Sequence, residues 1–113
     1  MIRKAEMKDL SIIAELACQL WPDNTVDEMC SEMGRILAKP DAAFFLAYAE
    51  KVPIGFAQCQ LRHDYVEGTD SSPVGYLEGI YVTESYRHHG IAKRLLHACE
   101  AWAKEQGCTE FAS

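Results

Sequence analysis

The chain has 113 residues, and its 17 acidic residues outweigh 11 lysines and arginines to give a formal net charge of −6. Apolar residues make up 49% of the chain and charged residues 25%, as in ordinary globular proteins. This length predicts one domain with its own core. The composition argues against collagen-like, disordered and disulfide-rich classes, and the acidic charge predicts no nucleic-acid partner.

The sequence shows no sign of a membrane segment or a metal site. No apolar run approaches the roughly 20 residues that cross a bilayer, so we expect no membrane partner. The N-terminus lacks the apolar segment of a signal peptide. The five widely spaced cysteines predict free thiols in a cytoplasmic protein. Cysteines and histidines show no zinc-ligand spacing, so we expect no metal.

Two helices are predicted after a short strand at residues 2–5. The first carries an apolar stripe at helical spacing: Leu10, Ile13, Leu16, Ala17 and Leu20. Asp9 is a candidate N-cap or first-turn acid of this helix, and Pro22 ends it because the residue before a proline disfavours the helical region. The second helix begins at a capping box formed by Thr25 and Glu28 and stops before the next proline.

The middle of the chain has strand patterns. Residues 43–49 are apolar and rich in aromatics, which predicts a buried strand. Residues 54–62 form a second predicted strand, joined to the first by a tight turn at Glu50 and Lys51, so the pair is an antiparallel hairpin. Alternation in the second strand places four side chains on one face: Ile54, Phe56, Gln58 and Gln60. Residues 63–73 are a predicted loop.

The last part of the chain alternates between strand and helix. Residues 74–82 form a third long strand, residues 90–106 a helix with an apolar stripe, and Gly107 its left-handed C-terminal cap. Residues 108–112 begin another strand. A strand–helix–strand crossover places its two strands parallel. The sequence therefore predicts an α+β fold, in which an antiparallel meander is followed by one parallel unit.

The turn before the last helix is a candidate anion site. Arg87, Gly90 and Ala92 have the spacing R-x-x-G-x-A, where small residues admit a ligand close to the backbone. The free N–H groups of the first helical turn and the helix dipole favour an anion there, and His88 and Lys93 add donors and positive charge. The pattern fits a pyrophosphate, although an ordinary strand–helix turn with a glycine has the same spacing.

The segment from Val82 to Ala92 resembles motif A of the GNAT N-acetyltransferases, which bind acetyl-CoA at the start of the helix after their fourth strand. Further motifs resemble the aminoglycoside 6′-N-acetyltransferases of Gram-negative bacteria over essentially the whole chain. They are Trp21-Pro22, Arg62-His63-Asp64-Tyr65-Val66, Asp70-Ser71-Ser72-Pro73 and Leu77-Glu78-Gly79-Ile80. The resemblance implies the GNAT fold, with a mixed, mostly antiparallel sheet flanked by helices and here lacking the last strands.

This resemblance implies acetyl-CoA as co-substrate, with no metal. The pyrophosphate would lie on backbone amides of the loop and helix start, and the pantetheine arm would pair with the backbone of the preceding strand. The residues implied are Ile80, Tyr81, Val82, Arg87, His88, His89, Gly90, Ile91, Ala92 and Lys93. A bulge near Gly79 would splay this strand from its neighbour, and a backbone amide in the strand would polarise the thioester carbonyl.

Glu78 is the candidate catalytic residue. Carboxylates are depleted in strands, so one between Leu77 and Gly79 needs a reason, although a charge on a solvated sheet face is the simple alternative. As a catalytic group it would bind the substrate ammonium and accept its proton, directly or through water, because only a neutral amine attacks. Trp21, Tyr65 and Glu78 are the candidate substrate-binding residues, although core packing also explains the tryptophan.

Acidic loop residues are further candidates for a pocket that attracts a polycation, although a single loop acid is more commonly a solvated charge. They are Asp23, Asp64, Glu67 and Asp70.

The predicted function is transfer of acetyl from acetyl-CoA to the 6′-amine of an aminoglycoside antibiotic, by direct attack in a ternary complex without a cysteine nucleophile. One alternative is a GNAT enzyme for another amine, such as a polyamine, an amino sugar or a peptide. Another is an inactive CoA- or partner-binding fragment.

The resembling family continues past Ser113, where it usually carries an aspartate for the drug and a tyrosine suited to protonating the CoA thiolate. Residues 1–113 are therefore predicted to be a single, C-terminally incomplete GNAT domain. We expect its unpaired last strand to favour a homodimer, and we expect weak acetyl-CoA binding and poor acetylation.

Overall fold

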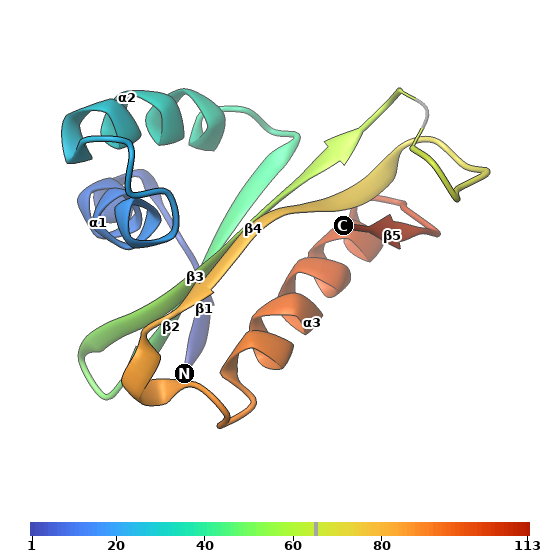
Figure 1. Ribbon diagram of the computed structural model, residues 1–113. Helices are drawn as coiled ribbons and strands as arrows, with labels where there is room; N and C mark the ends of the chain where they lie inside the picture. The colour runs from blue at the N-terminus through green and yellow to red at the C-terminus, as the bar shows by residue number, and fades with distance from the viewer. Residues whose placement is uncertain (65) are drawn as a thin grey trace.

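A computed structural model of the chain describes residues 1–64 and 66–113 and shows one sheet with helices on both faces (Figure 1). The strands are β1 (Ile2–Lys4), β2 (Ala42–Ala49), β3 (Val52–Arg62), β4 (Val74–Val82) and β5 (Phe111–Ala112). The helices are α1 (Leu10–Leu20), α2 (Val26–Leu37) and α3 (Ile91–Glu105), and short 3₁₀ turns lie at Met7–Asp9 and Glu84–Tyr86. Every predicted helix and strand is present.

The strands lie in the order β1-β2-β3-β4-β5. The first four pair antiparallel with their neighbours, whereas β5 runs parallel to β4. The chain passes from β4 to β5 through α3, as Figure 1 shows. This arrangement confirms the predicted α+β meander with one parallel strand–helix–strand unit.

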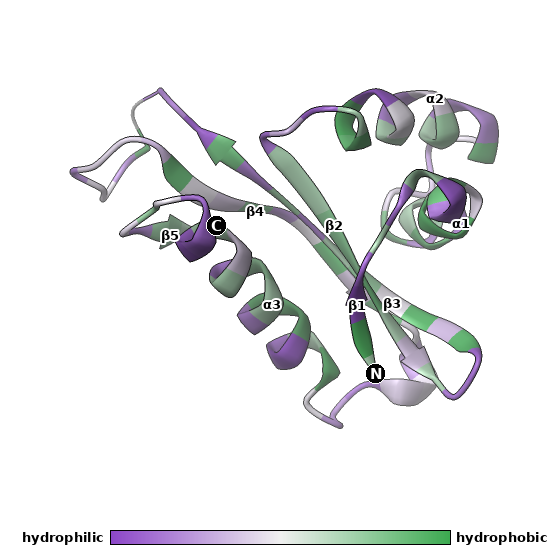
Figure 2. Ribbon diagram, turned by 180° about the vertical axis from the view of Figure 1, so that it is seen from behind, coloured by the Kyte–Doolittle hydropathy of each residue, from purple (hydrophilic) through white to green (hydrophobic). Residues whose placement is uncertain are grey.

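The sheet separates two apolar cores. Helices α1 and α2 cover one face, and α3 covers the other (Figure 1). Ile13, Met33 and Phe56 belong to the core under α1 and α2. Leu95 and Trp102 belong to the core under α3. Strand β2 is drawn mostly in green in Figure 2, because its alternate side chains enter both cores and nearly all are apolar.

The structure confirms two local signals of the sequence: the capping box at the start of α2 and the glycine at the end of α3. Thr25 Oγ1 accepts from the Glu28 amide at 3.1 Å, and Glu28 Oε1 accepts from the Thr25 amide at 2.8 Å, so the capping box starts α2. Gly107 has a φ of +95°, and the amides of Gly107 and Cys108 donate back into the last turn of α3. Glycine adopts this left-handed conformation without steric cost, which ends the helix and turns the chain towards β5.

The predicted alternation in β3 is wrong at its first position. Ile54 packs in the core under α3, whereas Phe56 packs under α1 and α2. The register with β2 shifts between Ala47 and Tyr48, so Ile54 is an extra residue in β3. A bulge of this kind moves the residues on either side of it out of phase.

Asp9 occupies the predicted N-cap position of α1, but its side chain makes no capping hydrogen bond. Its carboxylate accepts two hydrogen bonds from the guanidinium of Arg3 on β1, at 2.9 and 2.8 Å, and one from the amide of Glu6 at 2.8 Å. Arg3 also donates to the hydroxyl of Tyr48 on β2 at 3.0 Å. The hydrogen bonds from Arg3, the largest cause, lower the pKa of the buried Asp9 carboxyl to about 2. The ion pair therefore fastens the start of α1 to the edge of the sheet.

We expect Asp9→Asn to lower the free energy of unfolding by about 2 kcal/mol at pH 7, because the pKa of this carboxyl falls from 3.8 to about 2 on folding. A lowered folded-state pKa stabilises the protein fully above the unfolded value, and this stability is lost as the pH falls through the folded value. The difference in the free energy of unfolding between the wild type and Asp9→Asn should therefore drop to roughly half near pH 3. Urea unfolding at a series of pH values measures it. Glu15→Gln, an exposed carboxylate of α1, is the control. A difference that stays constant from pH 7 to pH 3 would contradict this role of the ion pair.

Candidate active site

An extra residue in β4 places two successive residues on the same side of the sheet. Gln58 pairs with Gly79 and Cys59 pairs with Leu77, so Glu78 has no partner of its own in β3. Such a bulge interrupts the alternation of a strand. Leu77 packs against the core under α3, while Glu78 and Gly79 both face the side of α1 and α2. The predicted bulge near Gly79 is confirmed.

Gly79 allows the indole of Trp21 to lie directly on the strand. A Cβ atom at Gly79 would come within 2.6 Å of Trp21 Cη2, so a side chain there would displace the ring. Trp21 follows the last residue of α1, and its ring meets Phe56 edge-on, with centroids 6.2 Å apart and an interplanar angle of 63°. Asn24 Nδ2 donates to the Trp21 carbonyl at 3.3 Å. The indole therefore forms a fixed wall above the bulge.

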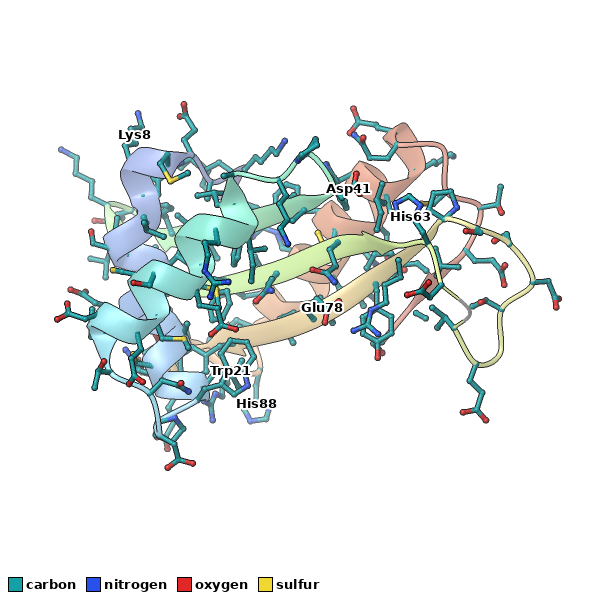
Figure 3. The ribbon with its side chains drawn as sticks, turned by 90° about the horizontal axis from the view of Figure 1, so that it is seen from above. Lys8, Trp21, Asp41, His63, Glu78 and His88 are labelled. Carbon is teal, nitrogen blue, oxygen red and sulfur yellow. The ribbon has the colours of Figure 1, made fainter. Side chains whose placement is uncertain are left out.

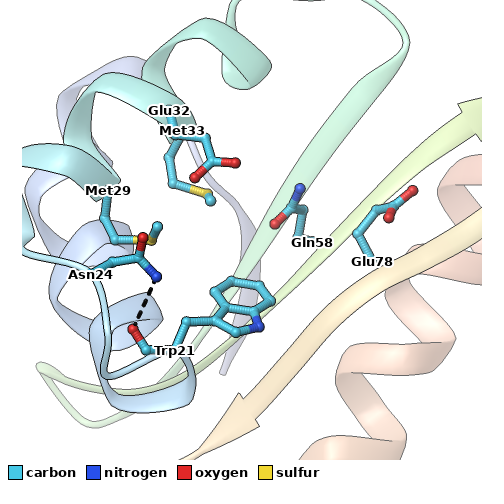
Figure 4. Close-up of a pocket in the computed structure, with 7 residues that line it drawn as sticks. All are labelled: Trp21, Asn24, Met29, Glu32, Met33, Gln58 and Glu78. Carbon is cyan, nitrogen blue, oxygen red and sulfur yellow. Dashed lines mark hydrogen bonds between the residues drawn. The ribbon is translucent and has the colours of Figure 1, made fainter.

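These residues border a pocket of about 410 Å³ between α2 and the sheet (Figure 4). Figure 3 shows Trp21 and Glu78 on the same side of the sheet. The methionines and the indole supply apolar walls, and carboxylates and amides supply polar groups. This mixture suits a cationic ligand that also has an apolar ring face. The lining residues are Trp21, Asn24, Met29, Glu32, Met33, Gln58 and Glu78.

Arg62 holds the carboxylate of Glu78. Its Nε donates to Oε2 at 3.0 Å and its Nη2 to Oε1 at 2.9 Å, which is a two-bond ion pair. The guanidinium carbon lies 3.7 Å from the ring centroid of Tyr76, and the pairing with Glu78 raises the pKa of Arg62. Each carboxylate oxygen keeps a free lone-pair direction, so Glu78 can still accept a hydrogen bond from an amine or from water.

Gln58 brings a second acceptor into the same pocket. Its side chain is buried, with 6% of the residue exposed, and it lies opposite Gly79 in the ladder between β3 and β4. Its Oε1 has no hydrogen-bond partner among residues 1–64 and 66–113. The pocket is therefore lined by a carboxylate and by a buried glutamine whose carbonyl is unpaired, on neighbouring strands.

The candidate anion site lies at the start of α3. Gly90 precedes the helix with a φ of +78°, and a Cβ atom there would meet nothing within 4 Å. The amides of Ile91 and Ala92 begin the helix and so have no acceptor inside it. Arg87 Nε donates to the carbonyl of Val82 at 2.8 Å, which ties the loop to the end of β4. The loop thus presents backbone donors where the helix dipole favours an anion.

The basic side chains of this loop are exposed. His88 has a positive φ of 68°, and Lys93 lies in the first turn of α3. His89 lines a different pocket, of about 610 Å³, together with Tyr48 and Arg94. The loop therefore adds positive charge around the start of α3, and His89 also lines the second pocket.

The outer edge of β4 is open over most of its length. Strand β5 pairs with β4 at Gly75–Tyr76, and Leu77–Val82 have no strand partner on this edge within the described residues. Ile80 packs towards α3 and Tyr81 towards α1, where its hydroxyl donates to a glutamine of α1 at 2.7 Å. An unpaired backbone edge that leads to an anion site suits an extended ligand with a charged end.

The pocket contains only some of the residues predicted to bind substrate. It brings Trp21 and Glu78 together, whereas Tyr65 lies outside the described residues. The four acidic loop residues, all in the described part of the chain, are absent from its lining: Asp23, Asp64, Glu67 and Asp70. Asp64 and Asp70 line a separate pocket at the 63–73 loop. The 63–73 loop lies between β3 and β4, beyond their ends, so its acids are not part of the pocket at the bulge.

The sequence prediction gave no role to several residues of this site: Met29, Glu32, Met33, Gln58 and Arg62. A signal was present for Gln58, since it is polar within an otherwise apolar stretch of strand. Arg62 stood in a recognised motif, but its pairing with Glu78 depends on strand register. The residues of α2 depend on how the helix packs over the sheet.

No helix in the parts of the chain described, 1–64 and 66–113, is long and apolar enough to cross a membrane. The same residues contain no group of three or more His, Cys, Asp or Glu side chains that could hold a metal ion.

Comparison with known proteins gives matches over almost the whole chain. The profile of the acetyltransferase (GNAT) family matches residues 7–113. An aminoglycoside N(6′)-acetyltransferase type 1 from Stenotrophomonas maltophilia is 45% identical over 113 residues, which cover 99% of this chain and 72% of that protein. An enzyme of the same name from Salmonella typhimurium is 44% identical over 112 residues, covering 99% of this chain and 77% of that protein.

Solved structures agree with these relatives. Aminoglycoside N-acetyltransferase AAC(6′)-Iy in complex with CoA is 43% identical, with a TM-score of 0.96 over 100% of this chain and 74% of that one. The same enzyme in complex with the bisubstrate analogue CoA-S-monomethyl-acetylneamine is 41% identical, with a TM-score of 0.94 over 100% of this chain and 78% of that one. The chain therefore belongs to the GNAT acetyltransferase family and has the predicted GNAT fold.

Proposed function

We propose that this protein transfers the acetyl group of acetyl-CoA to the 6′-amine of an aminoglycoside, by direct attack in a ternary complex. The observation that carries the proposal is the pocket at the β4 bulge, where Glu78 and Trp21 lie beside the open edge of β4. Relatives that match 99% of the chain bear the name of this activity, and a solved relative binds a bisubstrate analogue. Antibiotic resistance is the role that this substrate implies.

The loop before α3 fits the pyrophosphate of acetyl-CoA, whose thioester supplies the acetyl group. Open space beside Gly90 lets an anion approach the N–H groups of Ile91 and Ala92. His88 and Lys93 are exposed beside them and add positive charge. Backbone donors and the helix dipole thus support binding of the cofactor at this end of β4.

The open edge of β4 fits the pantetheine arm. Backbone groups of Ile80, Tyr81 and Val82 have no strand partner on this edge in the described structure, and they would pair with the extended arm as a further strand does. The hydrogen bond from Arg87 to Val82 keeps the strand end and the anion loop together. This hydrogen bond therefore fixes the anion loop relative to the open edge of β4, the two parts of the proposed cofactor site.

Glu78 would bind the ammonium group of the substrate and accept its proton, directly or through water, because only the neutral amine can attack a thioester. The two hydrogen bonds from Arg62 orient this carboxylate and leave one lone-pair direction on each oxygen. The proton would then pass onward to solvent. Glu78 is thus the proposed catalytic residue and Arg62 a residue that positions it.

Aromatic and acidic side chains would complete substrate binding. The fixed indole of Trp21 gives a flat apolar wall for a sugar ring. Glu32 is exposed at the pocket and adds negative charge that attracts a polycation. Tyr65 stays a proposed substrate-binding residue on the family resemblance alone.

A GNAT enzyme for another amine is the second candidate, since the anion loop and the open strand edge do not depend on the acceptor. Its acceptor would be a polyamine, an amino sugar or a peptide. The indole wall and the carboxylate favour an acceptor in which a cationic amine is attached to a ring.

We also propose that residues 1–113 form one GNAT domain and that the protein is a cytoplasmic homodimer. The five cysteines are all free thiols, which supports a reducing compartment. Within the described residues, the edge of β5 away from β4 has no strand partner, and such an edge favours association with a second copy.

Glu78→Gln tests the proposed function. We expect kcat with kanamycin to fall by about 10²- to 10⁴-fold, because the variant cannot accept the proton of the amine. A thiol-release assay with acetyl-CoA measures turnover, and Glu100→Gln on the exposed face of α3 is the control. Unchanged turnover would remove Glu78 from its catalytic role. Polyamines, amino sugars and peptides in the same assay identify the acceptor, and no release with any amine would overturn the proposed activity.

Gly90→Ala tests the cofactor site against a closely matched control. Gly90 and Gly107 lie at opposite ends of α3, both have positive φ, and a Cβ atom meets nothing within 4 Å at either position. Both substitutions should cost about 1 kcal/mol of stability. Only Gly90→Ala should weaken acetyl-CoA binding, by about tenfold, since its methyl group hinders approach to the helix amides. Calorimetric titration measures this, and equal affinities in the two variants would contradict the cofactor site.

Sedimentation velocity tests the homodimer. We expect the main species to have twice the chain mass of 12.7 kDa at micromolar concentration. A monomer at every concentration would contradict the proposal.

A further inference from the structure

We propose that Gln58 is a second amine-binding residue: its side-chain carbonyl accepts a hydrogen bond from the 6′-amine and, together with Glu78, sets the direction of the amine lone pair. This inference deepens the proposed function and rests on it. No motif or comparison above gives Gln58 a role.

The carbonyl of Gln58 is buried without a partner. Only 6% of the residue is exposed, and Oε1 makes no hydrogen bond within residues 1–64 and 66–113. Polar atoms in protein interiors are nearly always hydrogen-bonded, because an unmade bond costs stability. Because Gln58 lines a pocket, a donor that arrives with the ligand would complete this bond.

No donor of the described residues, the Trp21 indole and the Asn24 amide of the pocket included, bonds the carbonyl of Gln58. The methionine side chains of Met29 and Met33 have no N–H or O–H group. Arg62, on the same strand, is bound through two hydrogen bonds to Glu78. The free carbonyl is thus left for the substrate.

The position of Gln58 matches the expected place of the amine. It pairs with Gly79, the residue that follows Glu78 in the β4 bulge. Figure 4 shows its amide between the side chains of α2 and Trp21 on one side and Glu78 on the other. A group that enters this pocket therefore meets Gln58 and Glu78, which project from adjacent strands.

The chemistry of the amine needs two such acceptors. A neutral primary amine has two N–H bonds and one lone pair, and the lone pair must point at the thioester carbon. If the two N–H groups donate hydrogen bonds to Glu78 and Gln58, the lone pair remains free to point at the thioester carbon. A single acceptor would let the amine rotate about that one bond, so the second acceptor supplies orientation as well as binding.

Three variants test this inference with kanamycin as acceptor. Gln58→Met removes the carbonyl at similar volume. Gln58→Glu keeps an acceptor oxygen. Gln60→Met is the matched control, since Gln60 is the same residue type two positions along β3, on the same face, and does not line the pocket. Steady-state kinetics, calorimetric titration and thermal melting are measured for each.

We expect Gln58→Met to lower kcat/KM for kanamycin by about 10- to 100-fold, with part of the loss in kcat, and to leave KM for acetyl-CoA unchanged. Its free form should melt at or above the wild-type temperature, because an unpaired buried polar group is removed. Gln58→Glu should recover part of the activity, and Gln60→Met should behave as wild type.

Other outcomes overturn the inference in distinguishable ways. Wild-type kinetics in Gln58→Met would show that the amine does not use this carbonyl, while the proposed function stands. If Gln58→Met and Gln58→Glu both lose activity and both melt at a lower temperature, Gln58 stabilises the fold and does not bind the amine. If the wild-type protein neither binds nor acetylates kanamycin, both the proposed function and this inference are wrong.

Discussion

The extra residue in β4 is the constraint on which the site depends. In a regular strand, Glu78 and Gly79 would point to opposite faces, and the carboxylate would face α3 whenever Gly79 met Trp21. The bulge places both on the side of α1 and α2, while Leu77 and Ile80 pack against the core under α3. One inserted residue therefore lets the same strand fill a core on one face and form a pocket wall on the other.

The pocket contains groups that the fold does not need for its own stability. The buried side-chain carbonyl of Gln58 has no hydrogen-bond partner among the described residues. Gly79 has no side chain to pack, and the indole of Trp21 lies on β4 at this position. By contrast, both oxygens of the buried Asp9 carboxylate are hydrogen-bonded to Arg3, and both oxygens of Glu78 are hydrogen-bonded to Arg62. The carbonyl of Gln58 differs from these carboxylates because its hydrogen bond is left unmade within the described residues. Such a local cost is expected where a protein binds a ligand.

The sequence predicts the helices and strands because their signals are local. The stripe from Leu10 to Leu20 and the capping box at Thr25 act within a few residues, and both appear as expected. The face of Ile54 was not predictable, since it depends on a register shift against β2. The pairing of Arg62 with Glu78 joins residues 16 positions apart on neighbouring strands. Family motifs make Glu78 the candidate carboxylate, but its orientation depends on pairing between strands, which spacing along the chain does not contain.

The distribution of charge reconciles an acidic protein with a phosphate-bearing co-substrate. Electrostatic interactions through solvent fade over about 8 Å at physiological ionic strength, so the anion loop at the end of β4 and the pocket at its bulge act separately. At the end of the strand, Arg87, Lys93 and helix amides would offer local donors to one pyrophosphate. At the bulge in the middle of the strand, Glu32 and Glu78 agree in sign with the net charge of −6 and would attract a polycation. A nucleic acid needs many phosphate contacts at once, and for that reason the overall charge argues against nucleic acid without arguing against a single pyrophosphate.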